Sequence, residues 1–382
     1  MKFRVDRDAL ADAVAWTARA LPSRPSVPVL AGIRMEAGEA LNISSFDYEV
    51  SAEVNLPATT DEPGTVLVSG RLLAEITRSL PGRPVEMELQ GSKAVLTCGN
   101  ATFTLLTMPT EDYPTLPEMP PPTGSVGSDV FAAAVTQVAI AAGRDDTLPV
   151  LTGVRVEIEG DTMTLAATDR YRLAVRELRW KPERADLSAS ALVPARTLAD
   201  TARSLTSGAE VSIALGLLGR PGTDTGGGEG MIGFEGGGRR TTTRLLDGEF
   251  PKFRSLLPNE VNAVAELPTA AFTESVKRVS LVAERSTPVR LTFSTGQLVL
   301  EAGTGDEAQA IETLEASFDG EDIQIAFNPQ YLLDGLSAID SDTTRMSFTI
   351  PTKPAVITGK PTGDEPAQPD YRYLLMPIRL AE

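Results

Sequence analysis

Residues Arg24–Val50 read RPSVPVLAGIRMEAGEALNISSFDYEV, and the same pattern returns at Asp145–Val175 as DDTLPVLTGVRVEIEGDTMTLAATDRYRLAV. A weaker third copy reads ERSTPVRLTFSTGQLVLEAGTGDEAQAI at Glu284–Ile311. The matching prolines Pro28 and Pro149 lie 121 residues apart. Self-similarity at a near-constant period is the signature of tandem structural units. The pattern therefore predicts a chain built from repeats.

A second block recurs in the same order as the first. It reads LVSGRLLAEITRSL from Leu67, LVPARTLADTARSL from Leu192 and AFNPQYLLDGLSAI from Ala326, at offsets of 125 and 134. Two independent blocks in one order predict three homologous repeats of roughly 127 residues, the chain length of 382 divided by three. Proline-rich joints at 112–124 and 249–258 close the first two repeats, because proline interrupts regular structure. We therefore expect domains at 1–122, 123–258 and 259–382.

The longer second spacing has a visible cause in the glycine-rich stretch Gly216–Gly238. This stretch lacks the lysine and hydroxyl residue of a GxxxxGK[ST] phosphate loop. We interpret it as a flexible hairpin loop.

Each repeat follows one plan of helices and strands. An amphipathic helix is expected at its start, in 8–21, 129–143 and 270–284, and a second helix within each copy of the second block. Stretches such as 40–46 and 162–168 place β-branched and apolar residues at the period of two that is typical of strands. The predicted fold class is α+β, with two helices and antiparallel sheets in each repeat.

Composition excludes several classes of function. The chain has no histidine, which excludes Ser-His-Asp triads, Cys-His pairs and His-ligated zinc. Its single cysteine, Cys98, excludes an internal disulfide and Cys-rich metal sites, so no metal or cofactor is expected. No apolar run reaches the ~18 residues of a membrane span, and the opening MKFRVDRDAL is charged where a signal peptide would be apolar. We expect a cytoplasmic protein that binds no membrane.

The chain carries 35 basic and 52 acidic residues, a net charge of −17. Such a balance argues against nucleic-acid binding, because neutralising phosphates supplies most nonspecific affinity. Net charge does not describe distribution, however, and an acidic exterior with a basic stripe would leave one surface for a polyanion.

Arginines recur at matching places in the repeats. Arg71 and Arg78 lie seven residues apart in the second block, and the offset of 125 carries them onto Arg196 and Arg203. Seven residues is about two helical turns, so each pair shares a helix face. Such a face is either solvated, with partners such as Glu75, or part of a common surface that contacts phosphates. The other candidate DNA-contacting residues are Arg24, Arg144 and Arg285, which precede the Pro-Val of each repeat, together with Lys277 and Arg278.

Several motifs together resemble one family over almost the whole chain. They are MKFRV, RPSVPVL, SSFDYEVSA, GRDDTLPVLTGV, ATDRYRLAV, EFPKFRSLLP, AFNPQYLLDGL and the final MPIRL. The family is that of the bacterial sliding clamps, the beta subunits of DNA polymerase III. The resemblance implies three clamp-type domains per chain and a head-to-tail homodimeric ring that encircles double-stranded DNA without reading its sequence. It also implies a non-catalytic processivity factor that tethers the replicative polymerase.

The resemblance further implies one hydrophobic pocket per protomer, which receives short peptides from the polymerase, the clamp loader and other proteins. Carried over by motif, its residues are Thr168, Tyr171, Arg172, Leu173, Pro251, Leu256, Leu374, Met376, Pro377, Ile378 and Arg379. Methionine adapts to varied apolar side chains, which suits such a site. Taken alone, Leu173 or Met376 would more often be a core residue.

Two departures from the family pattern bear on this assignment. Arg170 and Tyr171 stand where some relatives carry a smaller residue and a histidine, and the chain extends two residues past Arg-Leu. These departures leave open a clamp paralogue with altered partner or inhibitor affinity.

Two further hypotheses are compatible with the sequence. One is a three-repeat scaffold that does not bind DNA. The second is an enzyme whose carboxylates would come from Asp145–Asp146, Asp169 or Glu301. Asp169 repeats Asp47 at a distance of 122, which indicates a structural turn rather than a catalytic group.

Overall fold

A computed structural model describes residues 1–206, 208–216, 230–283, 287–303, 308–360 and 370–379. The centre of the Gly-rich stretch, 217–229, and Arg285 lie outside these ranges. The described chain divides into two compact units. Unit 1 holds Met1–Ala132, Trp180–Ala185 and Thr197–Leu245, and unit 2 holds Ala133–Arg179, Asp186–Arg196 and Leu246–Glu382.

The described ranges contain two α-helices per repeat, as predicted: α1 (Arg7–Thr17), α2 (Gly70–Ser79), α3 (Ser128–Ala139), α4 (Ala195–Ser204), α5 (Thr269–Val279) and α6 (Pro329–Ser337). Asp6 begins α1 by accepting hydrogen bonds from the backbone N–H groups of Asp8 and Ala9, the usual role of an N-cap carboxylate. The first helix of each repeat is shorter than its apolar pattern. α1 and α5 tighten into the 3₁₀ turns η1 (Ala18–Ala20) and η5 (Ser280–Val282), and α3 ends at Ala139.

Unit 1 contains two antiparallel sheets. The order in the five-stranded sheet is β5 (Thr59–Glu62), β1 (Lys2–Val5), β7 (Val85–Gln90), β8 (Lys93–Cys98), β9 (Ala101–Leu106). The order in the nine-stranded sheet is β14 (Lys181–Pro182), β10 (Gly124–Gly127), β16 (Glu210–Gly216), β17 (Met231–Gly236), β18 (Arg239–Arg244), β4 (Val50–Leu56), β3 (Leu41–Phe46), β2 (Gly32–Ala37), β6 (Gly64–Ser69). The interpretation of Gly216–Gly238 as a loop is wrong for its last part, because Met231–Gly236 form β17, which pairs with β16, while 217–229 lie outside the described residues.

Unit 2 repeats this arrangement. Its nine-stranded sheet runs β15 (Ser188–Pro194), β11 (Gly153–Glu159), β12 (Thr162–Thr168), β13 (Arg172–Arg179), β27 (Tyr371–Leu375), β26 (Ala355–Gly359), β25 (Thr343–Phe348), β19 (Ala263–Pro268), β23 (Ser317–Asp319). Its four-stranded sheet runs β22 (Ala310–Glu315), β21 (Gln297–Ala302), β20 (Val289–Ser294), β24 (Ile323–Phe327). Both nine-stranded sheets therefore cross from one repeat into the next. The middle repeat gives one sheet to each unit, so the two units cut across the three expected domains.

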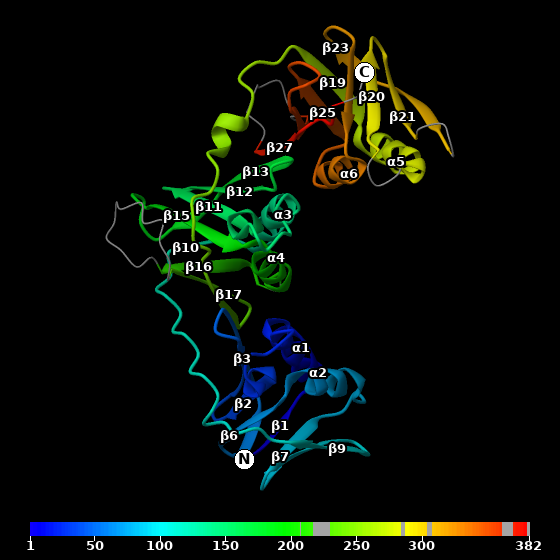
Figure 1. Ribbon diagram of the computed structural model, residues 1–382. Helices are drawn as coiled ribbons and strands as arrows, with labels where there is room; N and C mark the ends of the chain where they lie inside the picture. The colour runs from blue at the N-terminus through cyan, green and yellow to red at the C-terminus, as the bar shows by residue number, and fades with distance from the viewer. Residues whose placement is uncertain (207, 217–229, 284–286, 304–307, 361–369, 380–382) are drawn as a thin grey trace. The chain divides into compact units, whose positions relative to one another are not determined.

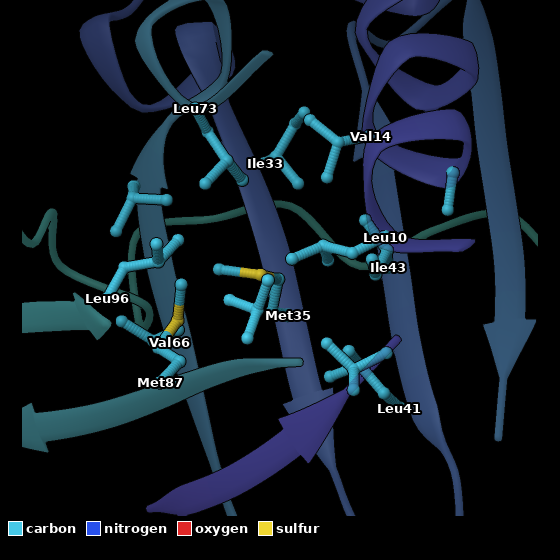
Figure 2. Packing of buried hydrophobic residues seen from close by; sticks show 14 of the residues in the cluster. Leu10, Val14, Ile33, Met35, Leu41, Ile43, Val66, Leu73, Met87 and Leu96 are labelled. Carbon is cyan, nitrogen blue, oxygen red and sulfur yellow. The ribbon is translucent and has the colours of Figure 1, made fainter. Parts of the chain in front are cut away.

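The core of unit 1 lies between its helices and sheets. Figure 2 shows Leu10 and Val14 of α1 facing Ile33 and Met35 of β2, with Leu73 of α2 close by. Helix α1 packs beside α2, as α5 packs beside α6 in unit 2 (Figure 1). Full burial of each such side chain stabilises the fold by about 1.5–3 kcal/mol. With these inner faces buried, the opposite helix faces carry the charged residues.

Candidate functional site

Four exposed apolar side chains that belong to the predicted pocket lie on three separate segments of unit 2. Tyr171 follows β12, Leu256 ends the 3₁₀ turn η4 (Phe253–Leu256), and Met376 and Ile378 follow β27. Their exposed fractions are 56%, 48%, 39% and 37%. We call these four residues the apolar patch. Exposed large apolar groups that occur together mark interaction surfaces more often than chance.

Backbone hydrogen bonds and a small core cluster hold the patch. The Met376 N–H donates to the Tyr171 carbonyl at 2.9 Å, and the Ile378 N–H donates to the Ala326 carbonyl at 2.8 Å. Phe253, three residues before Leu256, is buried in one cluster with Leu173 and Leu374. Met376 and Ile378 are therefore held to the rest of unit 2 through their backbone.

The eleven predicted pocket residues differ in their exposure to solvent. Tyr171, Pro251, Leu256, Met376, Ile378 and Arg379 are exposed, and Pro377 is half-buried. Thr168, Arg172, Leu173 and Leu374 are buried, with exposed fractions of 3%, 5%, 1% and 3%. These four support the patch from beneath, and Thr168 does so through a 2.6 Å hydrogen bond from its hydroxyl to the Arg172 carbonyl.

The turn that presents Tyr171 is shaped by Asp169. Its carboxylate accepts hydrogen bonds from the N–H groups of Tyr171 at 3.0 Å and Arg172 at 3.1 Å. Arg170 within the turn has φ of 79°, in the left-handed region that non-glycine residues rarely adopt. The first repeat has the same turn, since Asp47 accepts from Glu49 and Val50 and Tyr48 has φ of 76°. The structural interpretation of Asp169 and Asp47 is thereby confirmed.

A buried cation lies directly under this turn. The Arg172 guanidinium bonds Asp169 at 3.0 Å and Asp334 of α6 at 2.5 Å, and lies 4.3 Å from the centre of the Tyr331 ring. Burial raises the pKa of the Tyr373 phenol well above its usual range, so this group stays protonated and donates to the Tyr331 carbonyl at 2.8 Å. The network joins β13 of the second repeat to α6 of the third.

Sequence reasoning missed Tyr331 and Asp334. Their ring and carboxylate meet Tyr171 and Arg172 only because β13 and β27 pair across two repeats. Asp334 matches Asp200 at the offset of 134, so nothing in the repeat pattern sets Asp334 apart as a functional residue.

Where β18 pairs with β4, between the first and second repeats, the matching residues are polar. There the Arg244 N–H donates to the Glu49 carbonyl at 3.0 Å, as the Met376 N–H does to Tyr171. Both Arg244 and Glu49 are exposed. The same backbone hydrogen bond thus joins charged residues beside the β18–β4 pairing and apolar residues beside the β27–β13 pairing.

The repeated arginines lie where their spacing predicts. Arg71 and Arg78 are exposed on α2 opposite buried Leu73 and Ile76. Arg196 and Arg203 are likewise exposed on α4.

Some of these cations have partners within the chain. Arg203 pairs with Asp200 at 2.5 Å, and Arg71 donates to the carbonyls of Pro22 and Ser23 at 3.3 and 3.2 Å rather than to Glu75. Lys277 and Arg278 are exposed and paired with Glu274 and Glu312. Arg24 and Arg144 are exposed, and Arg285 lies outside the described residues.

Two of the carboxylates proposed for an enzyme, Asp145 and Asp169, have structural tasks. Asp145 accepts hydrogen bonds from the Thr147 hydroxyl and N–H, which lower the pKa of its carboxyl and disfavour a role as a general acid. Asp169 is engaged as described above. Within the described ranges, no three Asp, Glu or Cys side chains gather as metal ligands would. No described helix has the length and apolarity that crossing a membrane requires.

Comparison with known proteins covers the whole chain. Residues 1–117, 125–252 and 254–379 match the family models of the N-terminal, central and C-terminal domains of the DNA polymerase III beta subunit. The chain is 62% identical over 382 residues to the beta sliding clamp of Streptomyces coelicolor, covering 100% of both. It is 47% identical to GriR, a beta sliding clamp homolog of Streptomyces muensis, over 99% of both.

Solved structures agree with these sequence matches. A sliding clamp from Bacillus subtilis superposes with a TM-score of 0.89 at 26% identity, covering 100% of both chains. A sliding clamp from Pseudomonas aeruginosa, bound to griselimycin, gives a TM-score of 0.88 at 27% identity, again over 100% of both chains.

Proposed function

Because this chain belongs to the DNA polymerase III beta subunit family, the bacterial sliding clamps, we propose that it closes as a homodimeric ring around duplex DNA. It acts in replication as a processivity factor that tethers the polymerase. The family match over all three repeats favours this function over a scaffold that never meets DNA. Identity is also higher to the Streptomyces coelicolor clamp than to GriR, which gives no support to a specialised paralogue.

The observation that carries the ring is an unfinished sheet pattern. Each nine-stranded sheet joins five strands of one repeat to four strands of the preceding one, through β18 with β4 and through β27 with β13. The other two sheets have five strands ending at β9 and four strands ending at β22. β9 holds the place of β18 and β27 in its repeat, and β22 holds the place of β4 and β13. Pairing β9 of one copy with β22 of another would complete a third nine-stranded sheet.

The side chains on these two edges favour such pairing. Leu106 on β9 is 72% exposed and Ile311 on β22 is 61% exposed. An exposed edge strand with apolar residues is a template for another chain, and soluble proteins rarely leave one uncovered. Two copies joined twice in this way would make a closed ring of six repeats, with each joint of the same kind.

The charge pattern suits a ring that slides. Topology, rather than tight phosphate binding, would keep the ring on DNA, so a modest cationic lining is sufficient. The net charge of −17 would repel DNA from surfaces other than the lining. We propose that the protein is not an enzyme, that it works in the cytoplasm, and that its domains divide near 122 and 258. Its partners would be the polymerase, the clamp loader and other proteins whose short apolar peptides fit the patch.

Retention on circular DNA tests the ring directly. Clamp loaded on nicked circular DNA is expected to stay bound through gel filtration and to be lost once the DNA is cut to a linear form. Only a closed ring depends on the topology of its substrate. Equal loss from circular and linear DNA would contradict encirclement.

The lining is tested by its salt dependence. Replacing four arginines with alanine is expected to weaken binding to short duplex DNA and to reduce the slope of log K against log salt by about 2–4, because each lost phosphate contact removes about 0.9. The four are Arg71, Arg78, Arg196 and Arg203. Fluorescence anisotropy at several salt concentrations measures the slope.

A matched control keeps the change of charge but moves it to strands and turns. It replaces Arg4, Arg83, Arg179 and Arg240, which are also exposed. An equal slope change in both quadruple variants would mean that only net charge matters, and an unchanged slope in the first would exclude these helices from the lining.

A further inference from the structure

We propose that Asp334 is a positioning residue for the apolar patch: it holds Arg172, which fixes the turn that presents Tyr171, and so sets the affinity for partner peptides without touching them. This inference rests on the proposed function of the patch. It assigns a role to a carboxylate on α6, whose repeat counterpart Asp200 on α4 has another partner.

The first step is the pairing of Arg172. Its side chain is 5% exposed, and Asp334, on a helix of the next repeat, is 25% exposed. A buried guanidinium is costly unless its donors are used, so its position is dictated by its acceptors. Asp169 and Asp334 supply these from two sides, and the Tyr331 ring lies against its face. Asp334 is held in turn, because Gln330 donates to its other oxygen at 2.8 Å.

The second step is the link from Arg172 to the surface. Asp169 binds the Arg172 side chain and also the N–H groups of Tyr171 and Arg172, so the cation and the turn share one carboxylate. Arg170, within this turn, occupies a left-handed conformation, so the carboxylate of Asp169 holds a turn that is strained at one residue. Tyr171, between them, presents both its exposed ring and the carbonyl that receives the Met376 N–H.

The third step is a comparison within the chain. In the first repeat the turn has the same Asp and the same positive φ, but Val50 stands at the place of Arg172. On α4, Asp200 stands at the place of Asp334 and pairs with Arg203 of its own helix. The turn therefore forms without a buried cation. Arg172 and Asp334 occur together where β27 pairs with β13, beside the apolar patch. This placement indicates that the ion pair serves the patch and is not required to form the turn.

The test measures peptide affinity of the full-length protein. The probe is a fluorescent nonapeptide with three large apolar side chains, selected for binding to the unchanged protein. Asp334→Asn keeps the shape but removes the charge, and it is expected to weaken binding about tenfold, since a hydrogen bond to a charged group is lost or weakened. Asp334→Glu, which keeps the carboxylate, is expected to retain most of the affinity. Asp200→Asn is the matched control and is expected to leave peptide affinity unchanged.

Two further measurements separate positioning from general destabilisation. Amide exchange in Asp334→Asn is expected to accelerate at Met376, whose N–H reaches Tyr171, but not at Ile378, whose N–H reaches Ala326. With Arg172→Met in the background, adding Asp334→Asn is expected to cost no more affinity, because the two residues act through one contact.

The outcomes are distinct. Unchanged peptide affinity in Asp334→Asn, or additive losses with Arg172→Met, would overturn the positioning role while leaving the clamp function in place. Equal acceleration of exchange at Met376 and Ile378 would reduce Asp334 to a structural residue. If no apolar peptide binds the unchanged protein, the proposed function of the patch fails and this inference fails with it. Retention on circular DNA is expected to be the same in every variant.

Discussion

Replacing Leu106 and Ile311 together with aspartate is expected to convert the protein from a dimer to a monomer. Both side chains are mostly exposed in the single chain, at 72% and 61%, so the change removes little contact within the folded monomer. In the proposed ring each β9–β22 pairing buries one Leu106 side chain and one Ile311 side chain. Losing them costs about 1.5–3 kcal/mol per side chain, and each new carboxylate would have to be buried at the edge without a partner.

The expected loss is therefore at least about 100-fold in the dissociation constant of each β9–β22 pairing. A closed two-subunit ring has two identical joints, so both weaken in the same variant. Light scattering after gel filtration gives the mass, with one chain at 40.6 kDa and the dimer at twice that value. Loss of retention on circular DNA is expected to follow, because a monomer cannot encircle the duplex.

The control for this variant places aspartate at two other exposed apolar positions. Val261 and Ile350 are 52% and 47% exposed and lie outside β9 and β22. Val261→Asp with Ile350→Asp is expected to remain dimeric. If the Leu106 and Ile311 variant also keeps the dimer mass with its circular dichroism unchanged, the ring is closed by other surfaces.

The features that the sequence predicted are those set by local chemistry. The repeats are detectable because two blocks of sequence recur in one order, and within the first block Asp47 and Asp169 each bind the backbone of their own turn. The spacing of Arg71 and Arg78 places them on one face of α2 for the same reason, since a helix relates residues seven apart. The apolar character of Met376 and Ile378 was visible in the motif at the end of the chain.

The features that it did not predict depend on pairing between distant segments. An edge strand is defined by the neighbour it lacks, and the residues of β9 and β22 alone do not show which strands will lack one. Arginine is ordinarily exposed, and the partners of buried Arg172 include Asp334, which lies 162 residues away in the sequence. The same pairing places Leu173 and Leu374 opposite each other, beneath the surface rather than in it.

Removing Met376–Glu382 is expected to abolish peptide binding while the fold and the dimer remain. Strand β27 ends at Leu375, and its pairing with β13 and β26 involves residues that the truncation keeps. The truncation takes two of the four side chains of the apolar patch. A peptide that buries its own apolar groups against them would lose about 3 kcal/mol or more, which is at least about 100-fold in affinity.

The truncation also removes two backbone hydrogen bonds, from Met376 to Tyr171 and from Ile378 to Ala326. Each contributes about 1 kcal/mol, so a small drop in melting temperature is expected and does not contradict a surface role. The double variant Met376→Ala with Ile378→Ala separates the two effects, because it keeps both backbone bonds. It is expected to lose peptide affinity nearly as far as the truncation does, with less change in melting temperature. If only the truncation loses affinity, the tail acts by bracing Tyr171, and the apolar contacts to the peptide come from Tyr171 and Leu256.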